Sequence, residues 1–64
     1  MHDLSNIQKA SYAIKMAYPD YNSGTICCIL EIDTMDLNQV HRVHLGVWKA
    51  NKKLGLRGGY KIHA

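Results

Sequence analysis

Residues 36–55 carry the sequence feature that most constrains the fold, because an apolar residue recurs there at every third or fourth position. The members of this series are Leu37, Val40, Val43, Val47, Ala50 and Leu54. Their spacing places them along one side of an α-helix. Asp36 can cap the start of such a helix, and Gly55 can end it. Gly46 costs about 1 kcal/mol inside a helix, so we expect a break there between helices over residues 34–45 and 47–54.

The middle of this segment has a second interpretation. Residues 43–47 read as a short strand could pair with residues 60–62. The helix is favoured because its periodicity extends through the whole segment. Beyond it, residues 56–64 form a basic segment with a Gly-Gly pair, for which we expect a short strand or an extended arm.

A second helix is expected over residues 5–18. Ser5 and Gln8 have the spacing of a capping box, and Pro19 stops a helix at the residue before it. The apolar residues between them recur at helical spacing. They are Leu4, Ile7, Ala10, Ile14, Ala17 and Tyr18.

Residues 25–32 are ambiguous. Ile26, Cys28, Leu30 and Ile32 alternate as in a strand, whereas Ile26, Cys27, Ile29 and Leu30 would form one apolar side of a helix. Periodicity cannot decide between the two over so few residues. The preceding residues 20–24 are polar and contain a glycine, which indicates a loop.

The length of 64 residues allows one small domain with a limited core. The two cysteines, Cys27 and Cys28, are adjacent and close no stabilising loop, so we expect either a cytoplasmic protein or a subunit that a partner stabilises. The longest apolar run, residues 26–30, is far shorter than the roughly 20 residues of a membrane span. The first residues lack the basic and apolar stretches of a secretory signal, and we expect none.

Charge is divided along the chain. Residues 1–36 hold two lysines and five carboxylates, a net charge of −3, whereas residues 37–64 hold six Lys and Arg residues and no carboxylate. A cationic half of this kind attracts phosphates and favours nucleic acid as a partner. The alternatives are a merely solvated surface and an acidic protein partner.

Residues 23–42 have the pattern of two short crossed helices, which need apolar residues at fixed positions and a small residue where they touch. The residues that fit are Ile26 and Leu30 on the first helix, Cys27 as the small residue, Ile32 after the turn, and Leu37 and Val40 on the second helix. In this respect the segment resembles the helix-turn-helix DNA-binding domains. The turn position, usually glycine, is Glu31, which departs from the pattern and favours a strained or longer turn.

This resemblance implies which side chains would face DNA. The outward positions of the second helix would be Asp33, Thr34, Met35, Asn38, Gln39 and Arg42. Amide side chains pair with adenine and guanidinium groups with guanine, so Asn38, Gln39 and Arg42 are the expected base readers, with Thr34 as a further donor. The expected backbone contacts are Lys49, Lys52, Lys53, Arg57 and Lys61.

The sequence therefore predicts an all-α domain of three or four helices, of helix-turn-helix type, with a short basic C-terminal tail. The leading function is sequence-specific binding of double-stranded DNA, as a transcriptional regulator or recombination accessory factor, by a homodimer. The alternative is a small protein–protein interaction module, an inhibitor or adaptor such as mobile elements carry, with its basic face on an acidic partner. RNA binding through the tail is a third reading.

We expect neither a metal site nor catalysis, and no cofactor. His41 and His44 could share a helical face, but the adjacent cysteines lack the spacing of zinc ligands. Both thiols lie in the most apolar stretch, where a buried thiol is inert. The sequence thus favours a binding protein over an enzyme.

Overall fold

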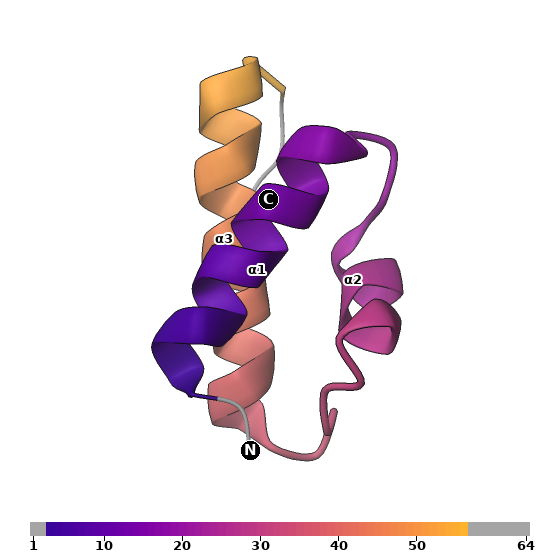
Figure 1. Ribbon diagram of the computed structural model, residues 1–64, viewed down its shortest axis with the longest axis vertical. Coiled ribbons are helices and arrows are strands. Elements are labelled where there is room, and N and C mark those ends of the chain that lie inside the picture. Colours follow the sequence, from indigo (N-terminus) through magenta and orange to yellow (C-terminus); the bar gives the residue numbers. More distant parts are fainter. Residues whose placement is uncertain (1–2, 57–64) are drawn as a thin grey trace, which may run out of the picture.

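The computed structural model describes residues 3–56, and within that range its regular secondary structure is all α-helix, without a strand (Figure 1). The helices are α1 (Leu4–Ala17), α2 (Ser23–Ile29) and α3 (Leu37–Leu54). α1 and α3 lie side by side, and the short α2 packs at the edge of this pair, mostly against α3. The expected all-α class is confirmed for these residues. The predicted tail lies outside them from residue 57 onward.

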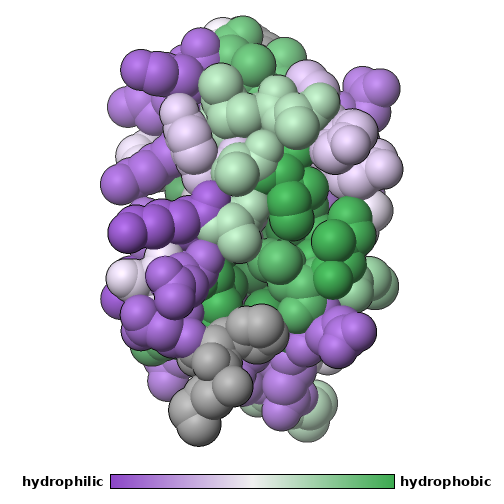
Figure 2. All heavy atoms as spheres, viewed as in Figure 1, coloured by the Kyte–Doolittle hydropathy of each residue, from purple (hydrophilic) through white to green (hydrophobic). Residues whose placement is uncertain are grey.

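One hydrophobic core fills the space between the three helices. It consists of Ile7, Ile26, Cys27, Ile32, Val43, Val47 and Ala50. Ile32 belongs to the connection between α2 and α3, and its backbone N–H donates to the Cys27 carbonyl at 2.9 Å. Figure 2 shows hydrophobic side chains on the surface over α2 and hydrophilic ones along the opposite edge, beside α3.

α3 is continuous through Gly46, so the expected break there is wrong, and so is the strand over residues 43–47. A Cβ atom on Gly46 would lie 2.5 Å from the Gln8 carbonyl oxygen and 2.8 Å from Ser11 Cβ. Ser11 is fully buried, and its hydroxyl donates to the Ile7 carbonyl at 2.7 Å. The glycine therefore allows α1 to approach α3, and this packing outweighs the cost of a glycine inside a helix.

The two caps predicted for α3 are confirmed, but the helix begins at Leu37 and not at the expected residue 34, because Asp36 caps it. The Asp36 carboxylate accepts a hydrogen bond from the Asn38 backbone N–H at 3.1 Å and another from the Gln39 amide at 3.1 Å. Gly55 ends the helix with a φ of 75°, in the left-handed region that glycine adopts without strain.

The capping box predicted for α1 is wrong. The residue at the N-cap is Asp3, which makes no side-chain capping bond. The Gln8 side chain instead accepts a hydrogen bond from Arg42 of α3 at 3.0 Å. The predicted stop at Pro19 is confirmed, since α1 ends at Ala17.

The buried side of α1 also differs from the predicted apolar stripe. Ser11 and Lys15 are buried, whereas Ala17 and Tyr18 are exposed. The Lys15 ammonium group donates to the carbonyls of Pro19 and Tyr21, both at 2.6 Å. Those two bonds satisfy the buried charge and fix the connection from α1 to α2.

The ambiguous residues 25–32 begin in a helix. Asn22 caps α2 by accepting from the backbone N–H of Thr25 at 2.8 Å. Ile26, Cys27 and Ile32 are buried. Leu30 and Val40 are partly buried against the same core, as the helix-turn-helix pattern predicts.

Two features of the connection depart from that pattern. Leu37 is 76% exposed, so its predicted inward position is wrong. It precedes the fully buried Val43 by six residues, which turns it about 120° away around the helix. Seven residues, 30–36, separate α2 from α3, whereas the turn of a helix-turn-helix has three or four. Glu31 nevertheless has a φ of 56°, the left-handed backbone expected at the turn.

We predict that Gly46→Ala destabilises the protein by about 1–3 kcal/mol, because the added methyl group must push α1 away from α3. Gly24→Ala is the matched control. It lies inside α2, and its Cβ would meet one side-chain atom at an ordinary 3.4 Å. Urea unfolding should show that Gly24→Ala is neutral or stabilising, as helix propensity dictates. Equal stability of both variants would contradict the close approach at Gly46.

Candidate nucleic-acid interface

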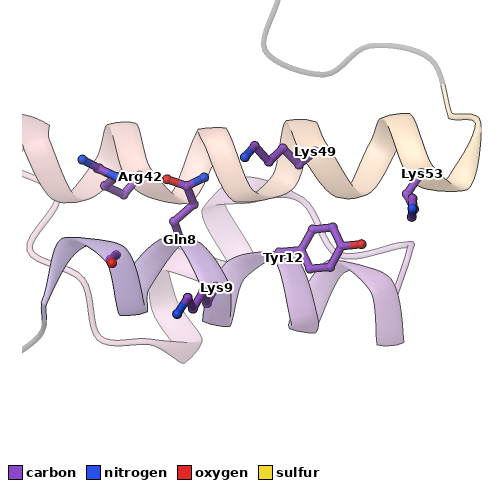
Figure 3. Close-up of a pocket in the computed structure, with 7 residues that line it drawn as sticks. Gln8, Lys9, Tyr12, Arg42, Lys49 and Lys53 are labelled. Atoms are coloured by element: carbon purple, nitrogen blue, oxygen red, sulfur yellow. Dashed lines mark hydrogen bonds between the residues drawn. The ribbon is translucent and has the colours of Figure 1, made fainter.

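A groove of about 570 Å³ lies between α1 and α3 (Figure 3). Four of its seven lining residues are cations, and none is a carboxylate. The lining residues are Ser5, Gln8, Lys9 and Tyr12 from α1, and Arg42, Lys49 and Lys53 from α3. The groove is therefore a local site of positive charge.

Helical geometry brings the three α3 cations together. Lys49 follows Arg42 by seven residues and Lys53 follows Lys49 by four, so all three project from the same flank of the helix. Lys9 joins them from α1, because α1 and α3 pack side by side. Lys9 belongs to the acidic half of the sequence, and only the packing of the helices adds it to this cluster.

The hydrogen bonds in the groove leave most of its cationic donors available. Arg42 donates one N–H to the Gln8 side chain across the groove, which orients the guanidinium group. A guanidinium has five N–H donors, so four others remain. Lys9, Lys49 and Lys53 have no hydrogen-bond or ion-pair partner among residues 3–56. These groups can therefore bind an anion without first breaking a bond within the protein.

The predicted base readers are only partly brought together. Asn38 is exposed on α3, one turn before Arg42 and on the same flank. Gln39 is half-buried, and its amide is held by Asp36. Thr34 is exposed but precedes α3. Of the predicted readers, Asn38 and Arg42 thus share a flank with the groove cations.

The prediction that Asp33, Thr34 and Met35 project outward from the second helix is wrong. Asp33, Thr34 and Met35 lie in the connection before α3 rather than on the helix. The Asp33 carboxylate accepts from the Met35 backbone N–H at 2.9 Å, which forms a local turn. Because the chain forms this turn, α3 begins only after it, at Leu37.

The predicted backbone contacts separate into three groups. Lys49 and Lys53 line the groove. The Lys52 ammonium lies over the ring of Trp48, 4.9 Å from its centroid, and is not part of the groove lining. Arg57 and Lys61 lie outside the described residues.

Sequence reasoning missed the α1 side of the groove. The sequence pattern assigns Ser5 and Gln8 to a capping box and indicates no binding role for Lys9 or Tyr12. Positions 5, 8, 9 and 12 share one helical flank, which the spacing alone could have revealed. No feature of the sequence showed that this flank would face the cations of α3.

A second cavity, of about 370 Å³, lies between α2 and α3 and is lined in part by Cys27, Cys28 and His44. Cys27 is buried, and its burial, together with the neighbouring Cys28, raises its pKa. Cys28 is exposed, so the expectation that both thiols are buried is wrong. Within residues 3–56 no three His, Cys, Asp or Glu side chains are grouped so that they could hold a metal ion.

Comparisons with known proteins were made at the level of families, single proteins and structures. No family model, curated protein or solved structure matches this chain. Within the described residues, no helix combines the length and apolar character needed to cross a membrane.

We predict that iodoacetamide alkylates Cys28 of the folded protein quickly and Cys27 slowly, because a buried thiol with a raised pKa forms little thiolate. Peptide mass spectrometry after a timed reaction should find the label first on Cys28. Both cysteines should react once the protein is unfolded in urea. Equal labelling rates in the folded state would contradict the burial of Cys27.

Proposed function

We propose that this chain is a small DNA-binding protein that holds the phosphate backbone of a duplex in the groove between α1 and α3. The observation that supports it is the convergence of Lys9, Arg42, Lys49 and Lys53 on a groove without a carboxylate among its lining residues. Phosphate contacts from lysine and arginine supply nearly all of the non-specific affinity of proteins for DNA and a large share of the specific affinity.

The length of the groove suits a polyanion. Arg42 and Lys53 are eleven residues apart, about 16 Å along the axis of α3. Double-stranded DNA carries a negative charge for about every 1.7 Å of its axis. Several phosphates would therefore lie within reach of the groove cations at once, which favours an extended nucleic acid over a single small anion.

Base reading is assigned to the exposed start of α3. Asn38 lies one turn before Arg42, and an amide side chain can make two hydrogen bonds with adenine. The helix-turn-helix resemblance supports this role through the buried Ile26, Cys27 and Ile32 and the left-handed Glu31. A homodimer would double these contacts, and we infer a transcriptional regulator or recombination accessory factor.

The proposal predicts binding of a fluorescein-labelled duplex of 20 base pairs, measured by fluorescence anisotropy in 50 mM salt. The dissociation constant should lie in the nanomolar-to-micromolar range and rise steeply as salt is added, because bound cations release counterions from DNA. Absence of binding in 50 mM salt would reject the proposal. Binding to polyglutamate in its place would assign the groove to an acidic protein partner.

Single lysine variants test whether the groove is the binding surface. Lys49→Ala and Lys53→Ala should each weaken binding several-fold and reduce the slope of log K against log salt by about 1. Lys52→Ala is the matched control, since it removes the same charge from the same helix but outside the groove. An equal loss in all three variants would indicate attraction by net charge alone.

Asn38→Ala tests the assignment of base reading separately. A preferred sequence is first selected from random duplexes. The difference in binding free energy between this sequence and unrelated duplexes should then be smaller in the variant by about 1–3 kcal/mol. Its affinity for unrelated duplexes should stay the same, because Asn38 carries no charge. An unchanged preference would remove Asn38 from the interface and leave the groove as a binder without sequence preference.

A further inference from the structure

The end of the molecule at which α2 leads into α3 exposes three large apolar side chains. Met35 is 85% exposed, Leu37 76% and Ile29 50%. Figure 1 shows the segment 30–36 running from the end of α2 to the start of α3 at this end. In Figure 2, hydrophobic side chains over α2 give way to hydrophilic ones towards this end of the molecule. Exposed apolar side chains with a polar rim are typical of a protein interaction site.

The rim of this surface is acidic. Glu31 and Asp33 precede Met35 in the connection, and Asp36 lies between Met35 and Leu37. Between Lys15 and Arg42 the chain has four carboxylates and no lysine or arginine. The surface therefore has the opposite charge to the groove between α1 and α3.

The backbone that presents these side chains is fixed by hydrogen bonds. The Asp33 carboxylate accepts from Met35 N–H, and the Asp33 carbonyl accepts from Asp36 N–H, both at 2.9 Å. Ile32 anchors the connection in the core. A partner would thus meet an ordered surface, and little entropy would be lost by ordering this segment on binding.

We propose that this surface docks a segment of a protein partner that carries an apolar side chain flanked by lysines or arginines. We call it the acidic–apolar surface and define it by Ile29, Glu31, Asp33, Met35, Asp36 and Leu37. Charge complementarity selects a cationic partner. A symmetric contact with a second copy would bring the same carboxylates face to face, which is unfavourable.

The test is a titration of the ¹⁵N-labelled full-length chain with a twelve-residue amphipathic peptide of lysine and leucine. Amide resonances of residues 29–37 should shift, and those of the groove residues should not. A peptide of the same pattern with glutamate for lysine is the control, and it should leave residues 29–37 unshifted. Shifts outside the acidic–apolar surface, or equal shifts with both peptides, would overturn the proposal.

Variants separate apolar docking from attraction by charge. The double variant Met35→Ser, Leu37→Ser should lower the affinity for the lysine peptide at least tenfold. Both side chains are mostly exposed, so the fold should persist, as checked by circular dichroism. Leu56→Ser is the matched control, because Leu56 is exposed just beyond the far end of α3. Undiminished affinity in the double variant would overturn the apolar part of the proposal.

Self-association is a distinct outcome of the same experiment. If the resonances of residues 29–37 broaden with protein concentration in the absence of peptide, the occupant is a second copy and the proposed partner is wrong. DNA binding is assigned to different residues, so its loss in the lysine variants would leave this titration unchanged. The two proposals therefore fail independently.

Discussion

The contact between α1 and α3 at Gly46 is the interaction on which the rest of the structure depends. The missing side chain at Gly46 and the small side chain of Ser11 let the two backbones approach within a distance that any Cβ atom would block. Close packing of two long helices supplies much of the burial in a domain too small for a large core. The same approach forms the groove, because it brings Lys9 alongside the cations of α3.

The carboxylates and most of the cations, which lie in different parts of the sequence, also lie on different parts of the folded surface. Glu31, Asp33 and Asp36 gather in the connection at the start of α3, while Arg42, Lys49 and Lys53 follow one flank of that helix. Opposite charges are thereby kept on separate surfaces. The groove residues and the acidic connection are therefore distinct parts of the surface, with opposite charge.

The features predicted correctly from sequence are governed by local physics. Asp36 caps α3, Gly55 ends it, and Pro19 stops α1, since each effect involves only residues within a turn of the chain. The buried Ile26 and Ile32 also agree with the pattern expected of them. The incorrect predictions include those for Ser5, Gly46 and Leu37. Helix propensity predicts a break at Gly46, but the packing of α1 against this residue keeps α3 continuous. The motif predicts that Leu37 points inward, but its position around the helix relative to Val43 exposes it.

The sequence by itself determined the all-α class of the described residues, the stop of α1, the caps of α3, and the gathering of most cations in the second half of the chain. Helical periodicity and capping act over a few residues, so they can be read without knowing the rest of the structure. Only the tertiary structure decided that Lys15 is buried between carbonyl groups and that Lys9 lines the same groove as the cations of α3. Those placements depend on how closely two helices distant in sequence approach each other, and that distance is set by side-chain volume at their contact.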